Sequence, residues 1–160
     1  MAEAPSRTTA VLDGEYVVFL VGLRINQVWR PDRWWATLMA GRAMDQALRG
    51  DPDSGMLDSR LVVTGRGPAF IQIWRSFVDL ERYAHAEDKL HQAAWKRYYK
   101  LVGRSGAVGL WHETYQVAPG QYEAMYVNMP RYGLASAGES APVSRRGESA
   151  RQRMSGAPES

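Results

Sequence analysis

The sequence contains no cysteine among its 160 residues. Disulfide bonds, thiolate metal sites and cysteine nucleophiles are therefore excluded, and histidine and carboxylate side chains remain as the strong ligands for a metal or a haem iron. Histidine is also scarce, with three residues in the chain. Any chemistry that needs an imidazole therefore depends on His85, His91 or His112.

The sequence also lacks a long hydrophobic segment and a large excess of charge. Its longest apolar run, around residues 16–23, is far shorter than the roughly 20 residues of a transmembrane helix, and residues 1–14 contain no continuous apolar stretch typical of a signal peptide. The net charge of +3 is modest, whereas a nucleic-acid-binding protein would carry a concentrated basic face. These features predict a cytoplasmic protein with no nucleic-acid or membrane partner.

Composition divides the chain into one domain and two flanking segments. After about Leu134 aromatic residues disappear, and Ala, Ser, Gly, Glu, Pro and Arg dominate. This composition predicts a disordered tail over residues 136–160, and a disordered N-terminus is expected over residues 1–14. The folded domain is therefore expected to cover residues 15–135, which is long enough for a proper core.

Hydrophobic periodicity within this domain predicts the order strand, helix, strand, strand, helix, strand. The expected strands are residues 16–25, 56–64, 69–75 and 107–117, and the expected helices are residues 31–49 and 76–102. Ser76 and Asp79 match a capping box at the start of the second helix. This order is the βαββαβ plan of an α+β, ferredoxin-like fold, in which the helices cover one face of the sheet.

The first expected strand is apolar on both faces. Val17, Phe19 and Val21 lie on one face, and Val18 and Leu20 lie on the other. Because the two helices cover only one face, the other needs a partner sheet, and we expect a homodimer.

The segment Trp111-His112-Glu113-Thr114-Tyr115 places an imidazole, a carboxylate and a phenol on one expected strand. Strand alternation puts His112 on one face with Thr114, and puts Trp111, Glu113 and Tyr115 on the other. His91 lies on the apolar stripe of the second helix, so His91 and His112 are expected to border one cavity between sheet and helices. His85 lies in a charged stretch of that helix and is expected to be solvated.

Several longer segments resemble a known family. They are Val21-Gly-Leu-Arg-Ile-Asn26, Trp74-Arg-Ser-Phe-Val-Asp-Leu-Glu-Arg-Tyr-Ala84, His91-Gln-Ala-Ala-Trp95, Gly109-Leu-Trp-His-Glu-Thr-Tyr115 and Tyr122-Glu-Ala-Met-Tyr-Val-Asn-Met-Pro130. Over nearly all of residues 15–135 the chain resembles the DUF4188 group, also called the fumagillin-pathway monooxygenase-like family. The resemblance implies a dimeric α/β barrel similar to the antibiotic-biosynthesis monooxygenases of secondary metabolism, oxidoreductases that act on electron-rich aromatic or polyketide substrates, often without metal or flavin.

A cofactor-free oxygenase needs a base, donors for the substrate anion and an apolar cavity. The candidate base is His112 or His91, although His91 also suits a core histidine. The candidate donors are Arg24, Asn26 and Tyr115, with an interfacial ion pair as the alternative role of Arg24. The candidate substrate-binding residues are Trp74, Tyr83, Trp95, Tyr98 and Glu113. Trp95 and Tyr98 also suit core positions, and Glu113 also suits an ion pair with an arginine.

Two other functions fit the same cavity. The resembling family is also linked to aldoxime dehydratases, which are haem enzymes on a related barrel, and His91 or His112 would then be the axial ligand. A small-molecule-binding protein without catalytic activity is the third possibility. A Soret absorption band would identify haem, and ligand binding without turnover would identify the binding protein.

Overall fold

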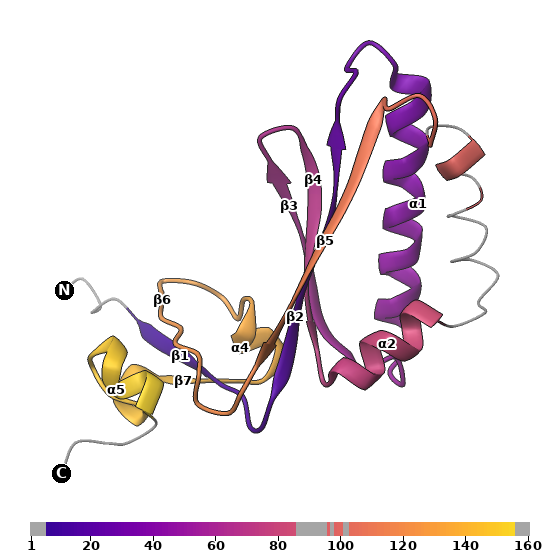
Figure 1. Ribbon diagram of the computed structural model, residues 1–160. Helices are drawn as coiled ribbons and strands as arrows, with labels where there is room; N and C mark the ends of the chain where they lie inside the picture. Colours follow the sequence, from indigo (N-terminus) through magenta and orange to yellow (C-terminus); the bar gives the residue numbers. More distant parts are fainter. Residues whose placement is uncertain (1–5, 86–95, 97, 101–102, 156–160) are drawn as a thin grey trace.

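The computed structural model describes residues 6–85, 96, 98–100 and 103–155, which form two antiparallel sheets (Figure 1). The larger sheet has the order β3-β4-β2-β5 and comprises β2 (Tyr16–Ile25), β3 (Met56–Thr64), β4 (Gly67–Trp74) and β5 (Val108–Val117). The smaller sheet has the order β6-β1-β7 and comprises β1 (Arg7–Val11), β6 (Tyr126–Val127) and β7 (Glu139–Pro142).

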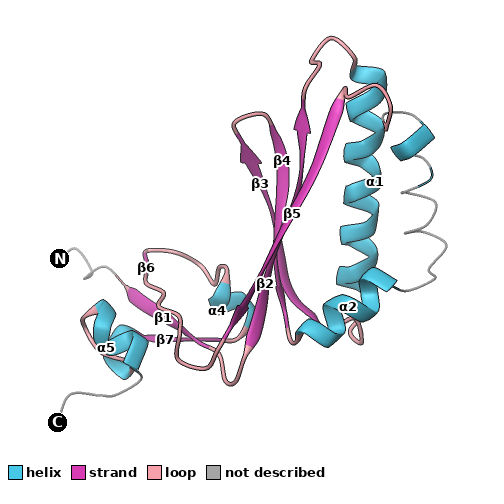
Figure 2. Cartoon of the chain, viewed as in Figure 1, coloured by secondary structure: helices cyan, strands magenta, loops and turns pink. Residues whose placement is uncertain are grey.

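Helices α1 (Pro31–Gly50) and α2 (Phe77–His85) lie on one side of the larger sheet (Figure 2). The order β2-α1-β3-β4-α2-β5 confirms the predicted α+β, ferredoxin-like plan. The predicted continuation of the second helix beyond His85 falls largely outside the described residues. Among the described helices, none is long and apolar enough to cross a membrane.

The strand register decides which side chains face the helices. Phe19 of β2 pairs with Gln72 on β4 and with Thr114 on β5, and Val21 pairs with Phe70 and His112. Because side chains alternate along a strand, these residues share the face that α1 and α2 cover.

The start of α2 is fixed by Asp79, which is buried. As the capping box predicts, the Asp79 backbone N–H donates to the Ser76 hydroxyl at 3.1 Å. The Asp79 carboxylate accepts bonds from the Ser76 hydroxyl (2.8 Å), Arg75 (2.9 Å) and Arg82 (2.7 Å), rather than returning a bond to the Ser76 backbone. The Arg75 guanidinium, together with the Ser76 hydroxyl, holds the pKa of Asp79 below its ordinary value. The carboxylate thus joins the end of β4 to α2.

The two terminal segments differ from their expected disorder. Thr8 of β1 pairs with Tyr126 of β6 and with Pro142 of β7, so both ends of the chain share the smaller sheet. Short helices follow at α4 (Leu134–Ala137), residues 143–145 and α5 (Ala150–Ser155). We call β1 and residues 118–155 the terminal module. The small residues of this module, whose composition predicts disorder, pack closely in the structure, where Ala10, Ala135 and Ala141 are buried.

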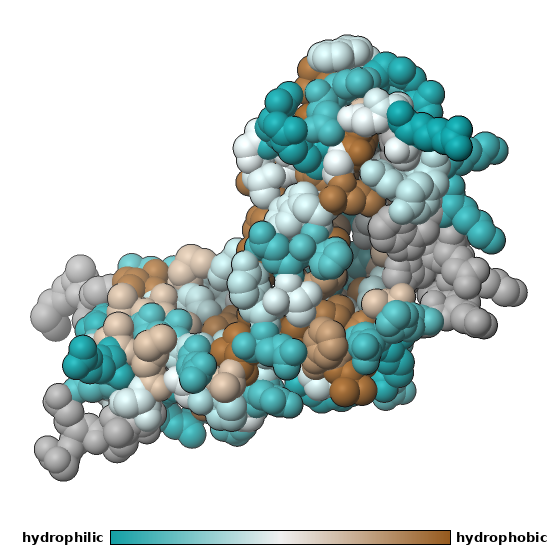
Figure 3. All heavy atoms as spheres, viewed as in Figure 1, coloured by the Kyte–Doolittle hydropathy of each residue, from teal (hydrophilic) through white to brown (hydrophobic). Residues whose placement is uncertain are grey.

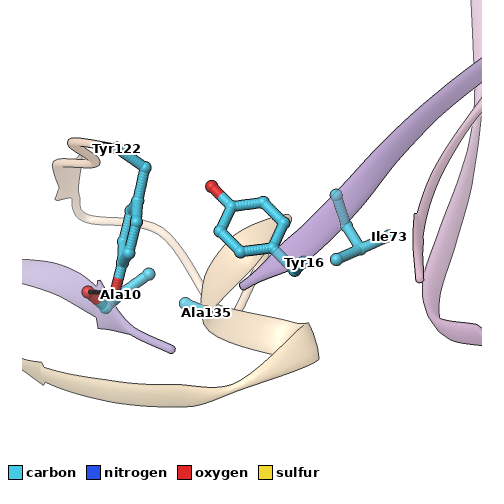
Figure 4. Packing of buried hydrophobic residues seen from close by; sticks show 5 residues of the cluster. All are labelled: Ala10, Tyr16, Ile73, Tyr122 and Ala135. Carbon is cyan, nitrogen blue, oxygen red and sulfur yellow. Dashed lines mark hydrogen bonds between the residues drawn. The ribbon is translucent and has the colours of Figure 1, made fainter. Parts of the chain in front are cut away.

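Tyr16 links the terminal module to the larger sheet (Figure 4). Its ring meets Tyr122 edge to face at 5.6 Å between centroids, and it packs in one buried cluster with Ile73 and Ala10. Burial, reinforced by the nearby phenols of Tyr122 and Tyr126, raises the pKa of Tyr16 to about 12. The module therefore covers one end of the sheet face that points away from the helices.

Candidate functional site

A cavity of about 510 Å³ lies between the larger sheet and helices α1 and α2. Its floor consists of helix-facing side chains of the sheet, and its walls come from the two helices. Most of the floor is apolar, including Phe19, Val21, Leu23, Phe70 and Leu110. Such a chamber suits a flat hydrophobic ligand, with specificity set by its few polar groups.

His112 lies on this floor, where strand alternation predicts it. Its partner across the strand is Val21, and its imidazole lies 5.7 Å from the Phe19 ring, centroid to centroid, with the planes tilted by 42°. No described residue forms a hydrogen bond with the imidazole. The ring is therefore open to a ligand both as a proton acceptor and as a donor.

Two predicted wall residues, Tyr83 and Tyr98, also line the cavity. The Tyr98 hydroxyl donates to the Val108 carbonyl oxygen at 3.2 Å, and burial raises its pKa. Trp74 is fully buried behind the wall and packs against Tyr83 at 5.5 Å between ring centroids. Trp74 therefore supports the cavity without lining it.

Four predicted site residues do not join His112 in this protomer. Tyr115 and Glu113 lie on the opposite face of β5, where the Tyr115 hydroxyl donates to the Glu113 carboxylate at 2.7 Å and this bond raises the pKa of Tyr115. Arg24 lies on that same face and donates to Asn26 at 2.7 Å, and the Asn26 amide donates to the Gly106 carbonyl oxygen. The sheet separates these side chains from the cavity, because residues of odd and even number along a strand face opposite sides.

His91 and Trp95 lie outside the described residues. His85, expected to be solvated, is exposed at the end of α2 but also lines the cavity. The sequence relates His85 to His91 along the helix but carries no signal for how close the end of α2 lies to the sheet, so only the structure places His85 beside the cavity.

Sequence reasoning also missed several polar residues of the cavity lining, among them Gln72 and Asp45. Asp45 of α1 accepts a short hydrogen bond from the Ser59 hydroxyl and pairs with Arg49 at 2.8 Å. Gln72 is an isolated polar residue in the apolar run Phe70-Ile-Gln-Ile-Trp74. A lone amide inside a buried strand was the available signal, because such a group needs a hydrogen-bond partner.

The sequence profile of a family described as Monooxygenase af470-like matches residues 16–134. No curated protein matches the chain significantly. Among solved structures, the aldoxime dehydratase OxdRE in complex with butyraldoxime is similar with a TM-score of 0.60 and 15% identity. The similarity covers 87% of this chain but only 39% of the dehydratase, and it shows a shared fold.

Two smaller proteins are similar at lower scores. SnoaB, a cofactor-independent oxygenase from Streptomyces nogalater, is 10% identical with a TM-score of 0.45, over 63% of this chain and 91% of its own. A dimeric protein of unknown function and ferredoxin-like fold from Bacteroides fragilis is 13% identical with a TM-score of 0.45, over 64% of this chain and 95% of its own.

Proposed function

Because this chain belongs to the monooxygenase af470-like family, we propose that it is a small oxygenase that needs no flavin or metal. Its substrate is an aromatic or polyketide-type secondary metabolite bound in the cavity beside α1. The observation that carries the proposal is the open imidazole of His112 on an otherwise largely apolar floor. The imidazole is solvent-exposed in the single protomer, and it can remove a proton from the carbon of a substrate that covers it.

The chemistry requires a substrate with an acidic methylene group beside a carbonyl or an aromatic ring. His112 takes one proton from the methylene carbon, and the resulting carbanion gives an electron to dioxygen. The two radicals combine into a peroxide anion, which the imidazolium of His112 protonates. Loss of water from the hydroperoxide leaves a carbonyl group, so that CH2 and O2 become C=O and H2O.

The floor around His112 favours a planar substrate. Phe19 lies beside the imidazole and presents an aromatic ring to the cavity, and aromatic rings stack in offset or tilted geometries at such distances. Leu110 and Val21 flank the same position. His112 and Leu110 are exposed in the single protomer, so a bound substrate must itself cover them to keep water from the carbanion, which would otherwise be reprotonated before oxygen reacts.

The proposal includes a homodimer formed through the sheet face that points away from the helices. Figure 3, which views the sheet nearly edge-on, shows scattered hydrophobic atoms among hydrophilic ones on that side. The terminal module covers the Tyr16 end of this face, but Leu20, Ile71 and Trp111 remain partly exposed. The Trp111 indole packs against Gly22, where an added Cβ would lie 2.8 Å from the ring. These apolar residues lie beside the polar Glu113 and Arg24 on the same face, and a partly apolar face of this kind can form an interface between two copies.

Oxygen uptake with β-tetralone, a bicyclic ketone with an acidic benzylic methylene, tests the proposed reaction. His112→Ala and His112→Gln should each lower turnover about 100-fold or more, the usual scale for loss of a general base. Tyr115→Phe is the matched control, because Tyr115 lies on the opposite face of the same strand. Equal loss in the Tyr115 variant, or full activity in both His112 variants, would contradict the assignment.

Two outcomes would replace this function by another. A Soret band in the purified protein, abolished in His112→Ala, would identify a haem protein with His112 as the axial ligand. The similarity to an aldoxime dehydratase makes that the second candidate. Saturable β-tetralone binding without oxygen uptake would identify a binding protein that lacks the reaction.

A further inference from the structure

We infer that Gln72 forms a hydrogen-bonding subsite in the cavity that selects ligands carrying a keto or phenolate oxygen. This inference deepens the proposed function and rests on it only in requiring that the ligand occupies the cavity. Gln72 is 4% exposed, yet its side chain belongs to the cavity lining. Gln72 is therefore a largely buried polar residue with part of its side chain facing the cavity in which the ligand would bind.

The orientation of the Gln72 amide is determined by Trp74. The Trp74 indole nitrogen donates to the Gln72 side-chain oxygen at 3.1 Å. An indole N–H can only donate, so the amide must direct its oxygen to Trp74 and its NH2 group away from it. The usual uncertainty between the oxygen and nitrogen of an amide does not arise here.

Trp74 cannot move easily to release this amide. Its side chain is 0% exposed and packs in one buried cluster with Val17, Leu48 and Leu80. Its ring also contacts Tyr83. The Gln72 NH2 group is consequently held in one direction before any ligand binds, which lowers the entropic cost of binding.

No described residue accepts a hydrogen bond from this NH2 group. The Gln72 nitrogen is not among the buried side-chain atoms without a partner, so it is accessible from the cavity, and a ligand that covered it without accepting its hydrogen bond would leave it unsatisfied. Asp45, which also lines the cavity, accepts hydrogen bonds from the Ser59 hydroxyl and from Arg49, and no hydrogen bond between Asp45 and Gln72 is present among the described residues. The missing group is thus a neutral or anionic oxygen on the ligand.

The register gives the scale of the ligand. Gln72 and Thr114 both pair with Phe19, so they stand on either side of this ring, and His112 is two residues from Thr114 along β5. Two strand spacings and two residues of rise separate the Cα atoms of Gln72 and His112 by about 12 Å. Both side chains extend from these positions into the cavity, so a ligand that contacts both is of bicyclic size or larger.

Anaerobic calorimetric titration with β-tetralone and with tetralin, the same ring system without the oxygen, tests the subsite. The wild-type protein should bind the ketone about tenfold more tightly or better, the scale expected for one buried hydrogen bond. Gln72→Met keeps the side-chain volume and removes the donor, so the two affinities should become nearly equal while tetralin binding stays unchanged. Trp74→Phe should lower the preference by a smaller factor, because the amide can then adopt both orientations.

Three results would overturn the subsite. The wild-type protein could show no preference for the ketone, the preference could survive in Gln72→Met, or both compounds could fail to bind at millimolar concentration. Trp74→Phe keeps the inference testable if the methionine variant does not fold, because an undiminished preference there would also contradict it. The measurement involves no turnover. An inactive protein with a Gln72-dependent preference would defeat the proposed oxygenase and leave the subsite intact.

Discussion

Replacing Tyr122 by phenylalanine tests whether the two ends of the chain form one packed module. The Tyr122 hydroxyl accepts a hydrogen bond from the Leu12 backbone N–H at 2.7 Å, which ties residue 122 to a segment 110 positions earlier. Tyr122 is buried, and the Arg146 guanidinium lies 4.6 Å from its ring centroid. Phenylalanine keeps the ring and its contacts and removes only the hydroxyl.

The expected loss of stability follows from the backbone groups that lose their hydrogen-bond partner when the Tyr122 hydroxyl is removed. The Ala10 carbonyl oxygen near the hydroxyl keeps a donor in Arg146 at 3.0 Å, but the Leu12 N–H loses its acceptor. An unsatisfied backbone donor costs about 1–3 kcal/mol when buried, and Leu12 is only half-buried, so we expect a loss of about 1–2 kcal/mol in the free energy of unfolding. For a chain of this length this lowers the Tm by roughly 2–8 °C.

Thermal unfolding followed by circular dichroism at pH 7 measures the difference. Tyr132→Phe is the matched control, because Tyr132 is exposed and none of the hydrogen bonds of the described residues involves its hydroxyl, so its change should stay within about 0.5 kcal/mol. Equal Tm values for the two variants would refute the packing of residues 7–14 against residues 118–155.

Three further predictions concern pH and assembly. Because the pKa of Tyr16 is raised in the folded protein, the Tyr16 contribution to the free energy of unfolding should be constant below about pH 10. Between pH 10 and about 12 the unfolded state alone loses the proton, so the free energy of unfolding should fall. In denaturant titrations Tyr16→Phe should flatten this fall. Because the pKa of Asp79 is lowered in the folded protein, its ionised carboxylate stabilises the fold above about pH 4, and this stabilisation is lost as the pH falls through the folded-state pKa. The Asp79→Asn variant should therefore lose less stability than the wild type between about pH 7 and pH 3. Light scattering at micromolar concentration should give a dimer that Trp111→Glu dissociates, and a wild-type monomer would contradict the interface.

The elements of the larger sheet were predictable because their signals are local. The strand Tyr16–Ile25 is a β-branched and aromatic run, and Pro31 marks the first turn of α1. Ser76 and Asp79 locate the start of α2. Such signals are read within a few residues, and tertiary packing does not override them here.

The terminal module was not predictable from composition. Ala10, Ala135 and Ala141 come from separate parts of the chain and become a core only when β1 pairs with β7. Arg153 looks like a solvated tail residue, but it is buried against Glu123, with 2.7 Å between Nε and a carboxylate oxygen. Small and charged residues carry no periodic signal, so only long-range pairing shows their place.

For the candidate site, alternation along β5 was sufficient to place His112 beside Thr114 and opposite Tyr115. Grouping Arg24 and Tyr115 with His112 required their side chains to cross the sheet, which the same alternation forbids. Gln72 was overlooked because its significance depends on Trp74, whose indole orients the amide. Contacts of this kind arise from packing and cannot be read from spacing.

The central claim is that a ligand binds between the larger sheet and α1 against the ring of His112. Histidine-ring NMR signals during titration with β-tetralone test it most directly, with the His112 signal assigned by its loss in His112→Gln. We expect this signal to shift in a saturable manner, with the same dissociation constant that calorimetry gives for the ketone. Saturable binding of β-tetralone that leaves the His112 signal unmoved would contradict the claim.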